Sequence, residues 1–155
     1  MACGGEKAGD QAYEAPPGGP VGRVVFLRER GDGAMRVRLL KAKIHRARVT
    51  SCRLDYVGSL ALDVDLMEAA GIYPYEQVLV ANIDNGTRHE TYVVPAERGS
   101  GEVEVLGAAA HLVSPGHKVI IMAYADMEEA EARGHKPRVV LVGEDNRRIR
   151  LKEDV

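Results

Sequence analysis

Apolar and polar residues alternate along much of the chain after Met35, and this alternation predicts β-strands. From Arg46 to Ser51, the odd positions hold Ala, Val and Ser, whereas the even positions are basic or polar. A period of two is expected of a strand with one buried face. Leu60, Leu62 and Val64 repeat the pattern. The predicted strands are, in order, residues 43–52, 59–64, 77–83, 88–95, 102–106, 118–124 and 139–142.

Short helices and turns separate these strands. Asp65 is the predicted N-cap of a helix over residues 66–70, and Gly71 ends that helix. Asn85-Gly86 is the dipeptide favoured in a tight hairpin turn. The other predicted helices are a single turn at 107–111 and a short charged helix at 128–133. Many short strands with brief helical insertions indicate a mainly β chain that closes into a small barrel.

Residues 1–34 differ in character from the rest of the chain. The first twenty residues contain several Gly and three Pro with almost no apolar periodicity, which predicts disorder. A short apolar run at 24–27 is followed by the breaker Gly31-Asp32-Gly33. Met35 would serve well as a start codon. We therefore expect residues 1–34 to be either a genuine tail or the product of a mis-assigned gene start.

Composition argues against several classes of function. The net charge of −2 gives no general attraction to nucleic acid or membranes, and the absence of Trp argues against base stacking. The two cysteines form no C-x-x-C pair, which fits a reducing cytoplasm. The five histidines show no metal spacing, so no metal site is expected. No stretch has the length of a membrane span, and no secretory signal is recognised.

The candidate chemistry lies in Tyr56-Val57-Gly58-Ser59, between two predicted strands. A serine hydroxyl can attack the carbonyl of its own preceding glycine, and Gly58, without a Cβ, can be held in a strained or left-handed conformation that exposes this carbonyl. The resulting ester can eliminate to dehydroalanine, which hydrolyses to a pyruvoyl group. The alternative is an ordinary polar turn. Gly99-Ser100 is a second such pair, but it is better interpreted as a flexible hairpin end.

Seven basic residues and no acidic residue occur between Arg36 and Arg53. Most of them are expected on the solvated face of a strand. One or two could instead point inward and create a positive field near an anion site.

A set of short segments follows in a fixed order along the chain: Lys43-Ile44-His45-Arg46, Tyr56-Val57-Gly58-Ser59, Asp65-Leu66-Met67, Ala69-Ala70-Gly71-Ile72, Asn85-Gly86-Thr87-Arg88, Thr91-Tyr92, Glu97-Arg98-Gly99-Ser100 and Gly107-Ala108-Ala109-Ala110. Taken together, these segments resemble the pyruvoyl-dependent aspartate 1-decarboxylase family. The resemblance covers Met35 to about Asn146 and implies a double-psi β-barrel, assembled as a homotetramer of self-cleaved protomers. It divides the chain into 1–34, a barrel over 35–146 and a tail over 147–155.

The resemblance implies catalytic roles for four residues. Cleavage between Gly58 and Ser59 would convert Ser59 into a covalent pyruvoyl cofactor, whose ketone forms a Schiff base with L-aspartate and acts as the electron sink for loss of CO₂. Tyr92 would return a proton to the product, because a neutral phenol can donate one. Thr91 would donate to the oxyanion that forms during cleavage.

The resemblance also implies a substrate site. Arg88 can hold one carboxylate of the substrate with two parallel hydrogen bonds, and Lys43 supplies a second cation. Thr91 belongs to this set as well. The backbone of Gly107, Ala108 and Ala109 would line the pocket. Tyr56 and His45 lie near the cleavage point without an assigned role.

One residue departs from the family pattern. The family has Asn before the Gly-Ala-Ala-Ala segment, whereas this chain has Leu106, which cannot hydrogen-bond near the cleaved peptide. Cleavage is then slower, uses another donor or depends on an activator protein. The expected function is conversion of L-aspartate to β-alanine and CO₂ for pantothenate and coenzyme A synthesis. The alternatives are a pyruvoyl decarboxylase for another amino acid, an uncleaved barrel acting as a binding or scaffold protein and, with less support, a DNA-binding barrel.

Overall fold

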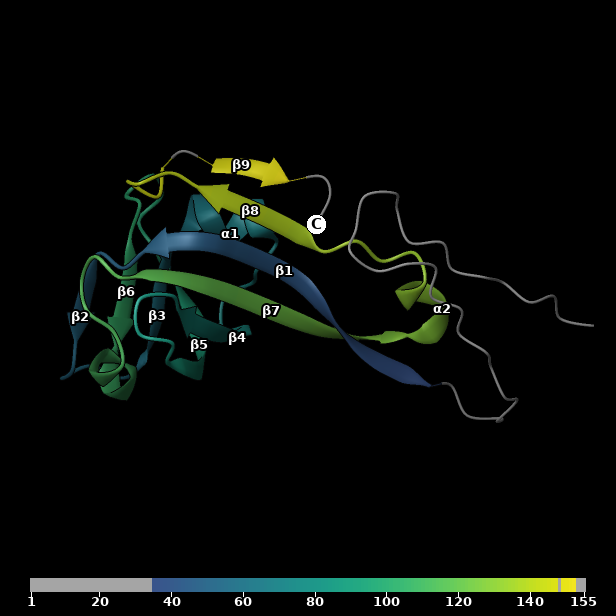
Figure 1. Ribbon diagram of the computed structural model, residues 1–155, viewed down its shortest axis with the longest axis horizontal. Coiled ribbons are helices and arrows are strands. Elements are labelled where there is room, and N and C mark those ends of the chain that lie inside the picture. Colours follow the sequence, from purple (N-terminus) through teal and green to yellow (C-terminus); the bar gives the residue numbers. More distant parts are fainter. Residues whose placement is uncertain (1–34, 148, 153–155) are drawn as a thin grey trace, which may run out of the picture. The chain divides into compact units, whose positions relative to one another are not determined.

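The computed structural model of the chain describes residues 35–147 and 149–152 (Figure 1). The disorder expected for residues 1–34 lies outside these residues. Within them, nine strands follow the order β2-β6-β3-β5-β4-β7-β1-β8-β9. The strands are β1 (Arg36–Arg48), β2 (Ser51–Arg53), β3 (Ser59–Asp63), β4 (Gln77–Asn82), β5 (Arg88–Ala96), β6 (Val103–Leu106), β7 (Lys118–Glu128), β8 (Arg138–Val142) and β9 (Ile149–Lys152).

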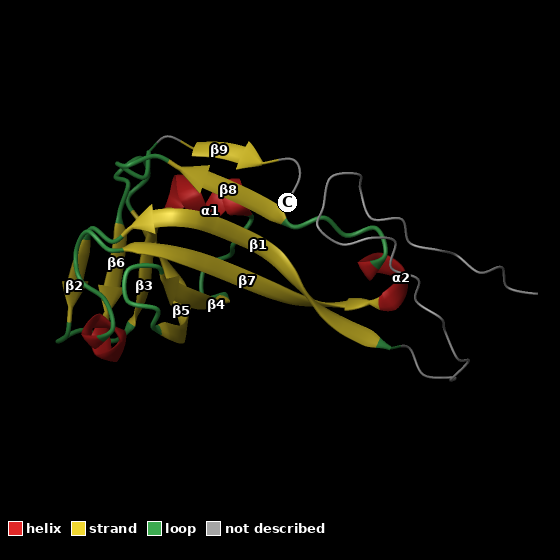
Figure 2. Ribbon diagram, in the orientation of Figure 1, coloured by secondary structure: helices red, strands yellow, loops and turns green. Residues whose placement is uncertain are grey.

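Three short helical segments are inserted between the strands. They are α1 (Val64–Ala70), the 3-10 helix η1 (Gly107–His111) and α2 (Glu129–Ala132). Figure 2 shows how far strands predominate over helices. The predicted mainly β class with short helical insertions is confirmed, and a barrel is consistent with it. The double-psi topology stays a prediction.

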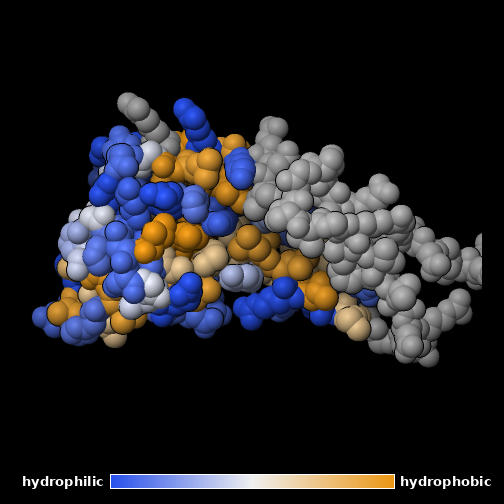
Figure 3. Space-filling model, viewed as in Figure 1, coloured by the Kyte–Doolittle hydropathy of each residue, from blue (hydrophilic) through white to orange (hydrophobic). Residues whose placement is uncertain are grey.

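β1 and β7 are the two longest strands and pair antiparallel along most of their length (Figure 1). β1 pairs on its other side with β8, in parallel. The β1–β7 register shifts between Ile44 and Ala47, where Arg46 takes a φ of 65°. Such a bulge re-aims the side chains at the end of a strand. In the same view, Figure 3 shows apolar residues gathered on the surface over β1 and β7.

β3 is buried on both faces, although its sequence alternates. Leu60 and Leu62 are fully buried in the core, and the intervening Ala61 is only 7% exposed. The strand lies between β6 and β5 near one end of the sheet order, and α1 follows it directly. Alternation is typical of a half-buried strand, so this pattern did not predict that Ser59 and Asp63 are buried as well.

The N-cap of α1 is Asp63, not the predicted Asp65. The Asp63 carboxylate accepts from the backbone N–H groups of Asp65 at 2.9 Å, Gly99 at 3.0 Å and Gly101 at 2.6 Å. One buried side chain therefore starts the helix and holds the loop after β5. The predicted end of the helix at Gly71 is confirmed, since Gly71 has a φ of 68° and donates to the last turn.

Two predicted hairpin turns differ from the structure. β4 and β5 do form a hairpin, but their pairing ends at Ala81 and Arg88, so Asn85-Gly86 lies in a longer loop. The Asn82 N–H donates to the Thr87 carbonyl at 2.8 Å and closes that loop. Gly99-Ser100 is not a hairpin end, because β3 lies between β5 and β6 in the sheet.

The C-terminal elements are longer or more numerous than predicted. β7 continues to Glu128, which also caps α2. β9 was not predicted, and it pairs antiparallel with β8. Its four residues are too few for alternation to be recognised, and most of them are exposed.

Candidate active site

The Gly58–Ser59 peptide joins an exposed loop to a buried strand. Val57 is 87% exposed, whereas Ser59, the first residue of β3, is 2% exposed. Ser59 aligns with Leu106 of β6. On the other side of β3, Leu60 aligns with Val93 of β5 in parallel. Extending this register by one residue places Ser59 beside Tyr92, so strand pairing brings the predicted nucleophile and the predicted proton donor together.

Gly107 packs closely against the predicted cleavage site. It has a φ of +69°, and a Cβ on it would lie 2.7 Å from the Gly58 Cα and 3.2 Å from the Tyr56 carbonyl oxygen. Real Cβ atoms do not come so close, so only glycine leaves room for the Gly58 peptide here. Gly107 was predicted to contribute its backbone, and the structure places that backbone against Gly58.

Gly58 itself does not take the left-handed conformation that was one of its two predicted states. The chain enters β3 directly after Gly58, and the left-handed residue at this point is Gly107 instead. A Cβ on Gly58 would meet the Leu106 carbonyl oxygen at 3.5 Å, an ordinary contact. The left-handed alternative for Gly58 is therefore wrong.

Leu106 is buried, at 2% exposure, directly opposite Ser59. It is also the N-cap position of η1 and makes no side-chain capping hydrogen bond there. The side chain at this position thus brings apolar surface, and no donor, to the neighbourhood of the Gly58–Ser59 bond. Along η1, Ala108 is exposed and Ala109 is partly buried.

β5 carries three of the predicted site residues. Arg88 and Tyr92 are exposed on one face of the strand, and Thr91 is partly buried on the other. Tyr92 keeps 38% of its surface exposed, so its hydroxyl can reach a bound molecule. The Arg88 guanidinium donates to the Gly86 carbonyl at 2.9 Å, a contact that a carboxylate could replace.

Strand pairing does not bring Lys43 next to the other site residues. Lys43 lies on β1, where it aligns with Met122 of β7 and Val139 of β8. β7 and β4 intervene between β1 and β5. Since neighbouring strands are about 4.8 Å apart, the path along the sheet from β1 to β5 is about 14 Å. Lys43 is partly buried and forms no ion pair within the described part of the chain.

Two histidines carry a buried ring nitrogen without a hydrogen-bond partner among the described residues: Nδ1 of His45 and Nε2 of His89. Burial lowers the pKa of both imidazoles, and the charges of Lys43, Arg46 and Lys152 lower that of His45 further. His89 was not among the sequence candidates. The available signal was its inward position in the alternation of β5, two residues before Thr91.

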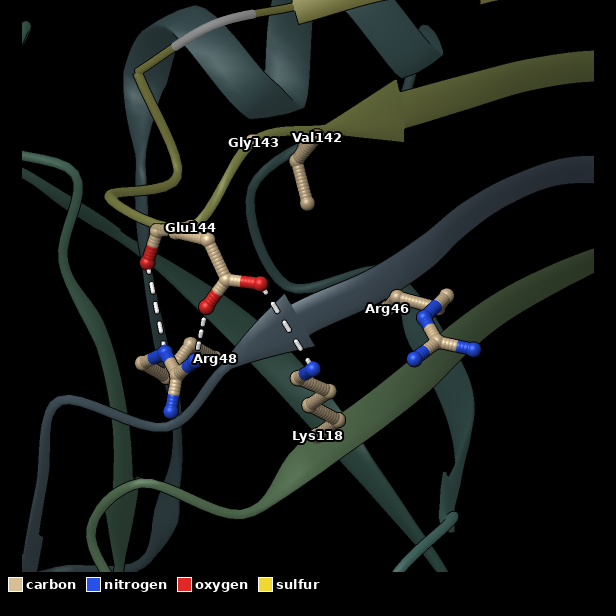
Figure 4. Close-up of a pocket in the computed structure, with 6 residues that line it drawn as sticks. All are labelled: Arg46, Arg48, Lys118, Val142, Gly143 and Glu144. Carbon is tan, nitrogen blue, oxygen red and sulfur yellow. Dashed lines mark hydrogen bonds and ion pairs between the residues drawn. The ribbon is translucent and has the colours of Figure 1, made fainter.

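A small pocket lies at the end of β1 (Figure 4). Its volume of about 40 Å³ is lined by Arg46, Arg48, Lys118, Val142, Gly143 and Glu144. Figure 4 shows Glu144 reaching both Arg48 and Lys118, and its carboxylate pairs with Lys118 at 3.6 Å. Because Glu144 pairs with both Arg48 and Lys118, the charges that line the pocket are partly neutralised, and none of the predicted site residues is among its lining residues.

Residues 35–147 and 149–152 show no features of a metal site or of a membrane-spanning helix. They contain no group of three or more His, Cys, Asp or Glu side chains that could hold a metal ion. None of their helices is long and apolar enough to span a membrane.

Comparison with known proteins gives one consistent result. A family model described as aspartate decarboxylase matches residues 35–149. The chain is 52% identical over 119 residues to the aspartate 1-decarboxylase of Caldicellulosiruptor bescii, and the aligned residues make up 77% of this chain and 93% of that protein. It is 53% identical over 115 residues to the aspartate 1-decarboxylase of Carboxydothermus hydrogenoformans, covering 74% and 91%.

Proposed function

The chain belongs to the aspartate decarboxylase family, and from this membership we propose that it decarboxylates L-aspartate to β-alanine and CO₂. The family resemblance inferred from the sequence motifs is thereby confirmed. One observation carries the proposal: the match over residues 35–149 includes the Gly58–Ser59 peptide and every predicted site residue. The product would serve the synthesis of pantothenate and coenzyme A.

The cofactor in this proposal is a pyruvoyl group made from Ser59. The Ser59 hydroxyl oxygen bonds to the Gly58 carbonyl carbon, and the peptide nitrogen leaves as an amine, so the amide becomes an ester. Elimination frees the Gly58 carboxylate and leaves dehydroalanine, and one water then replaces the nitrogen, which departs as ammonia. The residues present fit this chemistry, because Ser59 is buried and Gly107 leaves space at Gly58 that any Cβ would fill.

Thr91 and the backbone assist the cleavage step. A donor near the Gly58 carbonyl stabilises the negative charge that develops on its oxygen. Thr91 suits this role because it lies on β5 next to Tyr92, and β5 pairs with β3, the strand that begins at Ser59. Leu106 offers no side-chain donor, which is why an activator protein remains part of the proposal.

The pyruvoyl ketone supplies the electron-withdrawing group that condenses with the substrate amine and weakens the bond to the departing carboxylate. The chain's own residues bind and orient the substrate. Arg88 exchanges its contact with the Gly86 carbonyl for a two-point contact with a substrate carboxylate. Lys43 provides a second positive charge, Gly107, Ala108 and Ala109 present backbone groups, and the Tyr92 hydroxyl donates the proton that replaces the lost CO₂.

The proposed assembly is a homotetramer, and the proposed location is the cytoplasm. Large exposed apolar side chains near the cleavage site support association, among them Leu54, Tyr56 and Val57. Native mass spectrometry of the purified protein tests the assembly. Four cleaved protomers are expected, and a monomer would contradict this part of the proposal.

Intact mass of the denatured protein is the first test of the cofactor. We expect two polypeptides, one ending at Gly58 and one beginning with a pyruvoyl group in place of Ser59. The cleaved protein should then release CO₂ from L-aspartate. Release from another amino acid in a substrate panel would favour the alternative decarboxylase. A single uncut chain without activity would favour a binding or scaffold protein.

A further inference from the structure

A buried carboxylate lies two residues before Leu106 on β6. Glu104 is 5% exposed, and Arg53, the last residue of β2, donates to both of its oxygens at 2.7 and 2.8 Å. The Ser51 hydroxyl adds a third hydrogen bond at 2.9 Å. A two-point contact between a guanidinium and a carboxylate fixes orientation as well as distance. Arg53 is therefore held in one direction relative to β6.

β6 lies between the two ends of the loop that carries the proposed cleavage bond. Arg53 aligns with Leu106 in the β2–β6 pair, and Ser59 aligns with the same residue in the β3–β6 pair. Residues 54–58 therefore leave β2, cross the end of β6 and enter β3, a span of about 10 Å at the usual strand spacing. Because the loop of residues 54–58 starts directly after Arg53, a contact that holds Arg53 also holds the start of this loop.

Arg53 also contacts the loop that follows it. The centre of its guanidinium lies 5.1 Å from the centroid of the Tyr56 ring. The Tyr56 carbonyl oxygen would lie 3.2 Å from a Cβ on Gly107. The ion pair is thus connected through Tyr56 to the place where the loop meets Gly107. Leu54 and Tyr56 are each 52% exposed, so about half of the surface of each of these two loop residues faces solvent.

We propose that the Arg53–Glu104 ion pair positions the loop of residues 54–58 for cleavage between Gly58 and Ser59. The inference rests on the proposed self-cleavage. A peptide stays in a reactive conformation only when the surrounding structure fixes both of its sides. Ser59 is fixed by β3, and the ion pair fixes the other side. Both residues act through the loop, so they are positioning residues, and turnover after cleavage does not need them.

The competing interpretation is an ion pair that stabilises the fold and nothing else. Removing Arg53 altogether would leave a buried carboxylate unpaired and lower stability in either case. Two milder substitutions separate the interpretations. Arg53→Lys keeps a charge beside Glu104 but loses the planar two-point contact, and Glu104→Gln keeps the shape and loses the charge. Arg98→Lys is a control for the loss of a planar two-point contact at an exposed site, because Arg98 makes such a contact with Glu68 on α1, at 2.9 and 2.6 Å, and the Glu68 side chain is 62% exposed.

The experiment follows cleavage of the full chain by intact mass, from freshly synthesised protein onward. Both Arg53→Lys and Glu104→Gln should cleave at least about tenfold more slowly than wild type, whereas Arg98→Lys should stay within about twofold. Melting temperatures measured alongside show whether each variant is folded. Once fully cleaved, the two variants should match the kcat and KM of wild type for L-aspartate within about twofold.

Three results would overturn the inference. Cleavage of both variants at the wild-type rate would remove the positioning role and leave the proposed function intact. Equal slowing in Arg98→Lys would show that the effect is not specific to the Arg53–Glu104 pair. A wild-type chain that never cleaves would overturn the proposed function, and this inference with it.

Discussion

The sequence suggested that Gly58 both precedes the reacting serine and takes a left-handed conformation. In the structure Gly58 precedes the serine, and Gly107 is the residue with the left-handed conformation. Gly58 was identified because it precedes a serine between strands, which is local information. The left-handed backbone and the close approach belong to Gly107, nearly fifty positions away in the sequence. That contact depends on how β3 and β6 align, and local sequence contains no record of the alignment. The family resemblance named Gly107 as a residue that lines the pocket, but nothing in the sequence indicated that its backbone would lie against Gly58.

Gly107→Ala should nearly abolish cleavage. An alanine would need a backbone conformation that costs about 1–3 kcal/mol, and its Cβ would also displace the Gly58 peptide. Misplacement of about 1 Å can slow a reaction about 100-fold, and at least this loss is expected in an intact-mass time course. Gly116→Ala is the control, because Gly116 has a φ of +90° with nothing within 4 Å of a Cβ. Equal cleavage in the two variants would contradict the prediction.

His89 should make the folded chain less stable in acid. Burial lowers its pKa from the usual 6.5, so below that pH the unfolded chain binds more protons than the folded one. The contribution of neutral His89 to the free energy of unfolding is complete above pH 6.5 and declines as the pH falls below 6.5. Urea unfolding at about pH 5.5 and about pH 7.5 should show a smaller pH effect in His89→Leu than in wild type. An unchanged pH effect would exclude His89 as a cause.

At the scale of elements, the sequence located most strands and misplaced their connections. Strands with several apolar residues were recognised because the period of two survives in them. α1 was found, but its cap was assigned to Asp65 because an acidic residue directly preceded the apolar run. The true cap is Asp63, which the alternation had placed inside a strand. Its carboxylate serves both α1 and the 99–101 loop, and that second task comes from tertiary structure.

Asp63→Asn should therefore destabilise the fold more than Asp65→Asn. The amide would turn a donor toward one of the three N–H groups that the Asp63 carboxylate accepts, and losing a hydrogen bond to a charged group costs about 1.5–3 kcal/mol. The Asp65 side chain is 41% exposed and pairs with the exposed Arg98, a kind of contact that contributes little. Urea unfolding at neutral pH compares the two variants. A larger loss in Asp65→Asn would restore the predicted cap.

For the molecule as a whole, the sequence predicted the mainly β class and the family, but not the order of the strands. Parallel pairs such as β3–β5 and β1–β8 join segments that are distant in sequence, and hydrophobic pattern cannot specify such partners. The position of Lys43 illustrates the limit. Its spacing from Ser59 in the sequence gave no indication that β7 and β4 would lie between its strand and β5.

A chain beginning at Met35 should cleave and decarboxylate like the full chain. The family match begins at residue 35, and all the predicted site residues follow it. Cleavage rate and turnover of L-aspartate are expected within about twofold of the full-length values, measured by intact mass and CO₂ release. A large loss of either would assign a role to residues 1–34.

β1 sits between β7 and β8, and β2 pairs with β6, yet both β1 and β2 precede Gly58. After cleavage, the polypeptide that ends at Gly58 would contribute β1 and β2 to the same sheet as the strands of the other polypeptide. It could dissociate only if β1 separated from both β7 and β8. The nicked protein would remain whole while folded. Unfolding would release its parts, and renaturation would then require an encounter between two molecules, so recovery would depend on protein concentration. An uncut precursor folds its sheet within one chain. After cleavage the same fold would have to form from two separate polypeptides, so the protein would fold readily before maturation and refold poorly after it.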